Sequence, residues 1–245
     1  RYIMTMPIGP FVNGSAVVLG GLLGAWMGAK LPERVRTSLN PLFGLTSIGL
    51  GVMSIPGVKY YAAVVLAAVL GLVIGELCYL EKGIGKAAGS ARGLIDKIFP
   101  PKEGISQEEF LDKYVAIVVL FCASGTGVFG SMHEGMTGDP SILYIKTILD
   151  FFTAGIFAIT LGYAVSAIAV PQLAIQLSLF FLATLIVPLT TPEMRADFAA
   201  AGGLIMLATG FRITGMKSFP VANMLPSLLL IMPISYLWAT YIAAH

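Results

Sequence analysis

A lysine and an aspartate lie inside a stretch that is otherwise suited to a lipid bilayer. Residues 144–165 are numerous and apolar enough to cross a membrane, yet they include Asp150, with Lys146 one helical turn earlier. A carboxylate near the middle of a membrane helix costs about 2.5–3.5 kcal/mol on the insertion scale, so the default interpretation is a functional group that faces a polar cavity or a partner. The alternative is a structural i,i+4 pair that orients the helix.

Other polar side chains within or beside apolar stretches are further candidate contacts for a solute or ion. They comprise amides, one hydroxyl and one more acid: Asn13, Asn40, Asn223, Thr126, Gln172, Gln176 and Glu76. Asn13 and Asn223 each stand three residues after a proline, and capping of a helix start is the alternative role for both. Glu76 falls near the end of its apolar stretch, where an acid can reach the lipid headgroups instead.

Several motifs suggest chemistry that their context does not support. Residues 125–130 match GxGxxG, but a dinucleotide site needs a preceding strand in a βαβ unit, and this stretch is apolar. Close helix packing, or unwound backbone that lines a site, fits these glycines better. Residues 133–140 are expected to form an outer loop rather than a metal or proton site. Cys78 and Cys122 lie in apolar runs without a CxxC pattern, which favours small buried hydrophobes.

Composition places the chain in a membrane. Its 245 residues are 57% hydrophobic and only 11% charged, with a mean hydropathy of +0.87, whereas a soluble domain has about 25% charged residues. The formal net charge of +2 indicates no nucleic-acid partner. The apolar stretches contain no HExxH, no GxSxG and no pair of catalytic acids, so we expect neither an enzyme nor a cofactor.

Apolar stretches predict an all-α polytopic protein with about eight transmembrane helices in a single transmembrane domain, residues 1–245. The predicted spans are 10–29, 39–55, 60–80, 114–132, 143–165, 168–189, 198–213 and 221–243. Within the long polar segment 81–113, residues 84–99 predict an amphipathic helix in the plane of the membrane, or packed on the protein's own cytoplasmic face. Pro226 and Pro233 predict a kinked or broken last span.

The basic residues orient these spans. Eleven lie on one side of the predicted membrane, namely Lys30, Arg34, Arg36, Lys82, Lys86, Arg92, Lys97, Lys102, Lys113, Arg212 and Lys217. Three lie on the other side, namely Arg1, Lys59 and Arg195. By the positive-inside rule the first side is cytoplasmic, so both termini are predicted to be extracytoplasmic.

Small residues predict where the helices approach closely. The helix-packing candidates are Gly20, Gly24, Gly28, Gly71, Gly75, Gly127 and Gly130, several of them four residues apart on one helix face. Such faces permit a homodimer and serve equally well within one chain.

A shift of 106 residues aligns the chain with itself. It pairs Gly21 with Gly127, Gly24 with Gly130, and Gly49 with Gly155. The shift spans three predicted helices, so residues 10–80 and 114–189 would form an inverted repeat, with 198–243 as a final helix pair. Inverted repeats are typical of alternating-access transporters.

The opening IGPFVNGSAVVLGGLLGAWMG, then LPERVR and LNPLFGLTSIGLGVMSI, and the late stretch KSFPVANMLPSLLL resemble the YdfK/YqgA family of bacterial inner-membrane proteins. The resemblance runs through nearly the whole chain. It implies a multi-pass protein of the bacterial plasma membrane, described as a transport protein of unknown substrate. Members usually begin near the position of Met6 or Pro7, which leaves residues 1–5 as an extension or an uncertain start.

The sequence thus predicts a secondary transporter of a small solute or ion, surrounded by membrane lipids, with Asp150 as the proton- or cation-coupling carboxylate and Lys146 setting its charge state. The alternatives are an oligomeric channel or pore, and a membrane scaffold or sensor that works through residues 84–99.

Overall fold

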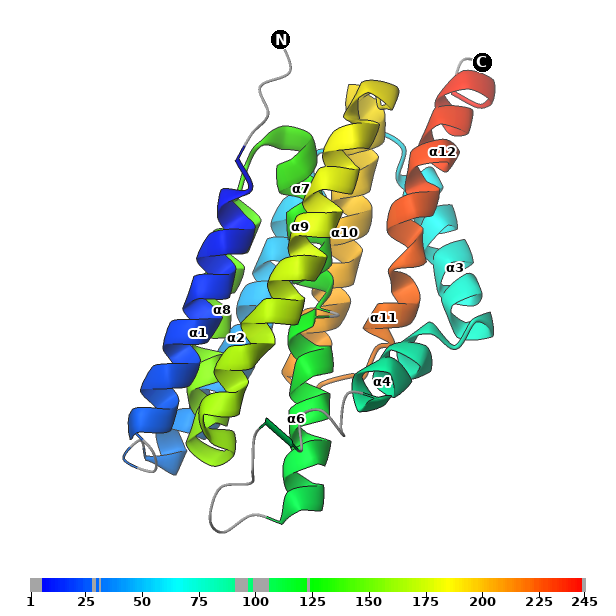
Figure 1. The fold of residues 1–245 in the computed structure, drawn as a ribbon. Coiled ribbons are helices and arrows are strands. Elements are labelled where there is room, and N and C mark those ends of the chain that lie inside the picture. The colour runs from blue at the N-terminus through cyan, green and yellow to red at the C-terminus, as the bar shows by residue number, and fades with distance from the viewer. Residues whose placement is uncertain are drawn as a thin grey trace. The chain divides into compact units, whose positions relative to one another are not determined.

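The structure, a computed structural model, describes residues 6–27, 30, 32–90, 97–98, 106–122 and 124–243 (Figure 1). Regular structure in these ranges is helical, and the described residues contain no strand. The predicted all-α class is confirmed.

The chain divides into two compact units, each made of two separate segments. Unit 1 contains Arg1–Leu39 and Lys82–Ala183, and unit 2 contains Asn40–Glu81 and Thr184–His245. These boundaries cut through the predicted first repeat, residues 10–80. The inverted repeat stays a prediction.

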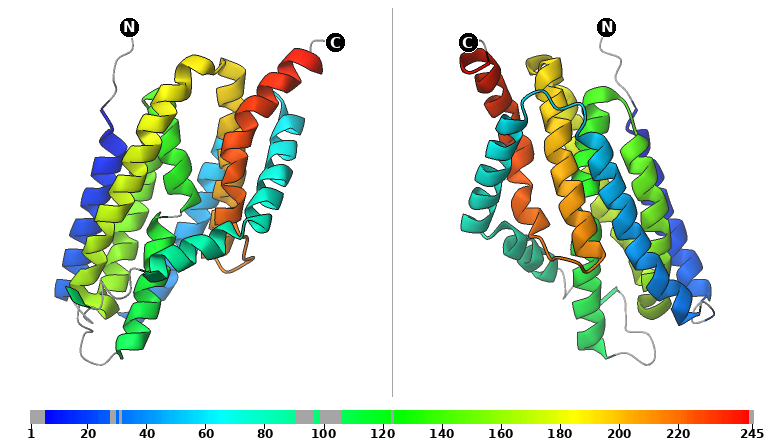
Figure 2. Two further views of the ribbon diagram at one scale, coloured as in Figure 1. Left: turned by 45° about the vertical axis from the view of Figure 1, so that its right-hand side comes forward. Right: turned by 180° about the vertical axis from the view of Figure 1, so that it is seen from behind.

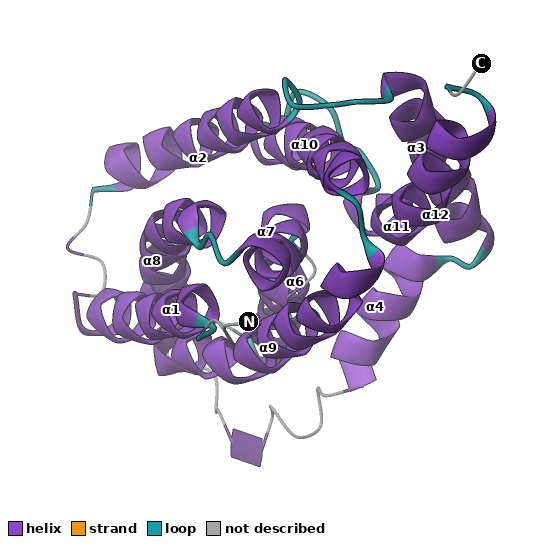
Figure 3. Cartoon of the chain, turned by 90° about the horizontal axis from the view of Figure 1, so that it is seen from above, coloured by secondary structure: helices purple, strands orange, loops and turns teal. Residues whose placement is uncertain are grey.

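Unit 1 is built around a closely packed group of helices. Its elements are α1 (Ile8–Met27), α6 (Gln107–Cys122), α7 (Gly125–Thr137), α8 (Ser141–Leu161), the 3₁₀ helix η2 (Gly162–Ile168) and most of α9 (Ala169–Ile186). Seen along the helices, α1 lies beside α8, with α7 and α9 next to them (Figure 3). Apolar side chains of α1, α6, α8 and η2 form one buried core, in which Tyr114 Oη donates to the Ala164 carbonyl at 2.9 Å.

Glycines bring the backbones of α1 and α8 together. A Cβ atom at Gly20 would meet the backbone carbonyl oxygen of Phe151, and one at Gly24 would meet that of Gly155. Four residues along α1, from Gly20 to Gly24, correspond to four residues along α8, from Phe151 to Gly155, in the same direction. The two helices therefore run parallel. Gly28 lies outside the described residues.

Unit 2 contains most of α2 (Glu33–Ser54), with α3 (Tyr61–Leu77), the 3₁₀ helix η3 (Val187–Leu189), α10 (Pro192–Ile213), α11 (Val221–Met224) and α12 (Pro226–Tyr241). Both views of Figure 2 show α3 beside α12. Gly71 faces the backbone of Ser227 and Gly75 faces that of Asn223, so α3 runs antiparallel to α11 and α12.

By length and composition, five helical stretches in the described residues qualify as membrane spans, or six if the bent pair Tyr61–Leu77 and Leu80–Ala87 is one span. One of them, Ser141–Leu189, has 49 residues. At 1.5 Å per residue this is about 70 Å, more than twice the roughly 30 Å of a hydrocarbon core. A shorter apolar helix covers Pro41–Ser54.

The long stretch contains two helices of opposite direction. Gly127 and Gly130 of α7 face Lys146 and Ile142, so α7 is antiparallel to α8. By contrast, Gly127 and Gly135 face Gln176 and Phe180, which makes α7 parallel to α9. Helices α8 and α9 therefore run in opposite directions, as two successive crossings would. The count of eight spans stays a prediction.

The fourth predicted span, 114–132, lies within one stretch that qualifies as a membrane span, Lys113–Thr137, and this stretch is divided into two helices. Helix α6 ends at Cys122, and α7 begins at Gly125 behind Ser124, whose extended backbone and side-chain oxygen cap the Gly127 N–H. Helix α7 then continues through most of the predicted loop 133–140. It stops at Gly138, whose φ of 76° is the left-handed conformation that glycine adopts at helix ends.

The predicted surface helix is described only in part. Helix α4 (Leu80–Ser90) follows α3 after a bend of 52°. Of the remainder of residues 84–99, only Lys97 and Ile98 are described, and both are exposed. The break predicted for the last span occurs at Leu225, between α11 and α12, with Pro233 inside α12.

Candidate functional site

Lys146 and Asp150 form a buried ion pair on one face of α8. Their spacing of four residues brings Lys146 Nζ onto Asp150 Oδ2. Lys146 is 3% exposed and Asp150 is 8% exposed. The i,i+4 pair that the sequence offered as a structural alternative is therefore present, and water is nearly excluded from it.

Three amides from two other helices complete the cluster. Asn13 of α1 donates through Nδ2 to Asp150 Oδ2 at 2.9 Å, and Gln172 of α9 donates through Nε2 to the same oxygen at 2.8 Å. Gln172 and Gln176 each donate to Asn13 Oδ1 at 2.7 Å. All three amides are at most 2% exposed. We call these residues, Asn13, Lys146, Asp150, Gln172 and Gln176, the polar centre.

The carboxylate fixes the direction of every hydrogen bond in the polar centre. An ionised carboxylate only accepts, so Asn13 must turn its NH₂ group toward Asp150 and its oxygen toward α9. Gln172 and Gln176 must then turn their NH₂ groups inward. As a result, Gln172 Oε1 and Gln176 Oε1 are buried and have no hydrogen-bond partner among the residues that the structure describes.

The break between α6 and α7 lies beside the polar centre. The Phe121 ring, at the end of α6, has its centroid 5.7 Å from Lys146 Nζ. At the start of α7, a Cβ atom on Gly127 would lie 2.7 Å from Lys146 Cε and 3.6 Å from Gln176 Nε2. A larger residue at this position would have to displace the flexible end of the Lys146 side chain.

Of the remaining predicted site residues, Asn223 and Glu76 belong to unit 2. Thr126 is buried on α7, next to Gly127. In unit 2, Asn223 Oδ1 accepts from the Glu81 N–H at 2.7 Å and so caps the start of α4. Glu76 is exposed on α3. The side chain of Asn40 lies outside the described part of the structure.

Two buried acids were missed by sequence reasoning, and both bind the start of a helix. Glu134 of α7 is 1% exposed and accepts from the Gly9 N–H of α1 at 3.0 Å. Asp197 of α10 accepts from the N–H groups of Lys59 and Tyr60, ahead of α3, at 2.8 Å each, and from Ser235 Oγ at 2.6 Å. Each acid lies near the end of an apolar stretch, and nothing in its spacing identifies the helix that it caps.

Glu134→Gln is expected to unfold near the wild-type temperature, because an amide oxygen can still accept from the Gly9 N–H. Glu134→Leu removes the acceptor, and we expect it to lose about 1–2 kcal/mol. Thermal unfolding of both variants in one detergent measures the difference. Equal stabilities would show that the cap contributes nothing.

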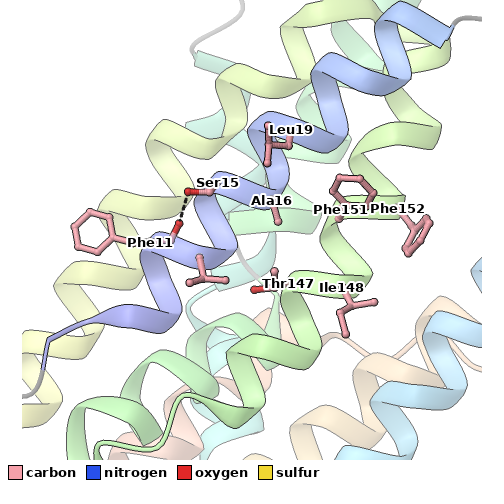
Figure 4. Close-up of a pocket in the computed structure, with 9 residues that line it drawn as sticks. Phe11, Ser15, Ala16, Leu19, Thr147, Ile148, Phe151 and Phe152 are labelled. Atoms are coloured by element: carbon pink, nitrogen blue, oxygen red, sulfur yellow. Dashed lines mark hydrogen bonds between the residues drawn. The ribbon is translucent and has the colours of Figure 1, made fainter.

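A groove of about 590 Å³ lies on the surface between α1 and α8 (Figure 4). Its lining is Phe11, Val12, Ser15, Ala16, Leu19, Thr147, Ile148, Phe151 and Phe152. The hydroxyls of Ser15 and Thr147 donate to carbonyls of their own helices at 2.8 and 2.7 Å. The groove therefore offers a mainly apolar surface, which suits a lipid chain better than a polar solute.

Among the described residues, no group of three or more His, Cys, Asp or Glu side chains could hold a metal ion. The polar centre instead combines one carboxylate, one ammonium and neutral amides. Such a set can exchange protons and can bind a small polar or ionic ligand.

Comparison with known proteins gives relatives of unknown function. Residues 8–236 match the family described as "Protein of unknown function (DUF554)". The "Uncharacterized protein YqgA" of Escherichia coli (strain K12) is 56% identical over 238 residues, which are 97% of this chain and 100% of that protein. The "Uncharacterized membrane protein YdfK" of Bacillus subtilis (strain 168) is 24% identical over 226 residues, 91% of this chain and 93% of that protein. No solved structure matches the chain.

Proposed function

Since the chain belongs to the YdfK/YqgA family of proteins of unknown function (DUF554), which includes a membrane protein, we propose its function from its own polar centre: secondary transport of a small solute or ion. Asp150 is the coupling carboxylate in this proposal, and Lys146 sets its charge state. The amides of Asn13, Gln172 and Gln176 orient the carboxylate and contact the ligand.

The observation that carries the proposal is a charged pair, buried and bridged by amides from two further helices. A buried ion pair is weak support for stability, because apolar replacements of similar volume are often neutral or stabilising by about 1–4 kcal/mol. Helices α1 and α8 already pack through Gly20 and Gly24. The polar centre is therefore better explained by function than by helix association.

Broken helices add to this support. Unwound backbone inside a membrane is tolerated where it is buried in protein or lines a cavity, and transporters use such breaks at their sites. The end of α6 and the start of α7 lie beside Lys146: the Phe121 ring centroid is 5.7 Å from Lys146 Nζ, and a Cβ atom on Gly127 would lie 2.7 Å from Lys146 Cε.

The location and assembly also belong to the proposal. We place the protein in the bacterial plasma membrane, with both termini extracytoplasmic and the basic loops cytoplasmic. Lipids cover its apolar faces, and a homodimer through a glycine face is compatible with transport. An inverted repeat of residues 10–80 and 114–189 would supply two alternating states.

The test is charge movement in proteoliposomes on a solid-supported membrane. Proton jumps, sodium jumps and a panel of small anions, cations and amino acids are applied to wild type and to Asp150→Asn. We expect a substrate-dependent current that Asp150→Asn abolishes although the variant still inserts. Asp197→Asn is the control for loss of a buried carboxylate, and Glu76→Gln is the control for an exposed one; both should retain the current.

Three other outcomes would argue against the proposed transport function. Normal coupled current in Asp150→Asn would remove this residue from the mechanism. Flux that persists in Asp150→Asn and does not saturate would indicate a pore. Silence of well-folded, correctly oriented wild-type protein across the panel would favour a scaffold or sensor that works through residues 84–99.

A further inference from the structure

We propose that Glu134 is the residue through which a proton reaches the polar centre from the side of the membrane on which α1 begins. This inference rests on the proposed transport function: it makes the proton the coupling ion and adds a second carboxylate to the route that ends at Asp150. Three features support it, namely an unused oxygen on a buried carboxylate, its attachment one helical turn from Asn13, and the titratable groups that lead from it toward water.

Only one oxygen of Glu134 serves its structural role. The side chain is 1% exposed, and Oε1 accepts from the Gly9 N–H at 3.0 Å. Oε2 is also buried, and it has no hydrogen-bond partner among the residues that the structure describes. A cap needs one acceptor, which a neutral amide would supply without the cost of burying a charge. The carboxylate and its unpaired oxygen therefore need a further explanation.

The arrangement allows Glu134 to gain and lose a proton while the cap stays in place. Oε1 can accept from the Gly9 N–H whether the carboxyl group is ionised or protonated. The positive end of the α1 dipole favours the ionised form. The protonated form has its hydrogen on Oε2, from which it can be donated. Proton exchange at Oε2 thus leaves the start of α1 unchanged.

Helix α1 brings Glu134 close to Asp150. Gly9 binds Glu134, and Asn13 donates to Asp150 Oδ2 at 2.9 Å. These two residues of α1 are four positions apart, hence on one helix face, and four positions correspond to about 6 Å along a helix axis. The two buried carboxylates are therefore attached to successive turns of the same helix.

Helix α7 directs the Glu134 side chain toward the polar centre. It begins where Gly127 faces Lys146, and side chains on a helix lean toward its start. Glu134 follows Gly127 by seven positions on the same face, with buried Ser131 between them. Ser131 Oγ donates to the Gly127 carbonyl at 2.7 Å and can still accept a hydrogen bond. A hydroxyl in this position can relay a proton over the remaining distance, alone or with water.

Other titratable groups continue from Glu134 toward water. The side chain of His133 is 22% exposed, and its Nε2 lies 3.8 Å from Oδ2 of Asp139, whose side chain is 55% exposed. On the inner side the charged groups are Lys146 and Asp150 of α8, whereas α1 and α9 contribute no charged side chain. Series of Asp, Glu and His residues are typical of proton relays in membrane proteins. In the proposed topology this outer side is extracytoplasmic.

The transfer balances without a further reactant. A proton from water binds Oε2 of the ionised Glu134. That O–H bond then breaks, its electron pair stays on Glu134, and a new O–H bond forms on the Asp150 carboxylate. Glu134 is ionised again, and Lys146 keeps its own proton throughout. Neutral Asp150 no longer compensates the Lys146 ammonium, and loss of this buried pair favours a change of conformation.

The first test uses Glu134→Gln, which keeps an acceptor for Gly9 and removes the titratable group. Purified protein in lipid is given a rapid drop in pH, and infrared spectroscopy follows the C=O bands of protonated carboxyl groups. Wild type should show bands from both acids, and Glu134→Gln and Asp150→Asn should each lose one of them. In Glu134→Gln the Asp150 band should rise about 100-fold more slowly, because a positioned proton donor is missing.

Two controls separate proton transfer from folding. Glu134→Gln should unfold near the wild-type temperature, so its slow band is not a sign of disrupted structure. Asp197→Asn removes another buried carboxylate that caps a helix, and it should leave the rate of the Asp150 band unchanged.

The second test is proton-driven solute current on the solid-supported membrane. Glu134→Gln should lose most of this current, as Asp150→Asn should, whereas Asp197→Asn should retain it. If Glu134→Gln kept the full current while Asp150→Asn lost it, the inference would fall and the proposed function would stand. If Asp150→Asn also kept the full current, the transport role of Asp150 would fall as well.

The infrared measurement needs no solute, so it decides the inference even if the transported solute stays unidentified. An Asp150 band that rises at the wild-type rate in Glu134→Gln would overturn the role of Glu134. The same conclusion would follow if Glu134→Gln lost no carboxyl band, since Glu134 would then not take up a proton.

Discussion

Lys146→Met is expected to destabilise the protein by about 3–5 kcal/mol. The substitution keeps the length and apolar stem of the side chain but leaves Asp150 buried, at 8% exposure, without its counter-charge. Asn13 and Gln172 still donate to the carboxylate, yet neutral amides do not compensate its charge. Thermal unfolding in a single detergent measures the loss.

The matched control is Lys146→Met/Asp150→Leu, which removes both charges. Apolar replacement of a buried pair is often neutral or stabilising, so the double variant should recover most of the stability lost by the single one. Wild-type stability of Lys146→Met alone would mean that Asp150 is in contact with water, contrary to the buried geometry.

Gly24→Ala is expected to destabilise the protein by about 1–3 kcal/mol and to weaken the polar centre. The added Cβ atom would meet the backbone carbonyl oxygen of Gly155, which has no rotatable bond with which to move aside. Helices α1 and α8 must then separate. Asn13, which α1 positions against Asp150, moves with its helix.

Gly49→Ala provides the comparison, since Gly49 also lies inside a helix but has nothing within 4 Å of its added Cβ atom. It should be neutral or stabilising by up to about 1 kcal/mol through helix propensity. Unfolding temperatures of the two variants measure the contrast. Similar values would show that close approach of α1 and α8 contributes little.

The polar centre could largely be anticipated from residue type. Polar side chains are rare within apolar stretches, so Lys146, Asp150, Asn13, Gln172 and Gln176 are conspicuous in the sequence, and the structure brings all five together. Residue type does not tell which helices meet. Asn13 and Asn223 stand in the same position relative to a proline, but one binds Asp150 and the other caps α4.

Other features depend on information that periodicity does not contain. The apolar run through residues 114–132 conceals the break at Ser124, because neither the capping serine nor the glycines interrupt its hydropathy. Glycine spacing predicted close packing for Gly20 and Gly24 without identifying α8 as the partner. The caps formed by Glu134 and Asp197 join residues more than a hundred positions apart, which no local pattern encodes.

The most direct measurement is transport by Lys146→Met/Asp150→Leu, because this variant separates function from folding. It should insert, unfold near the wild-type temperature and give no substrate-dependent or cation-dependent signal in the proteoliposome assays that detect wild type. Signals of wild-type size from the same well-folded variant would contradict a transport role for the polar centre and would leave Lys146 and Asp150 as a structural pair on α8.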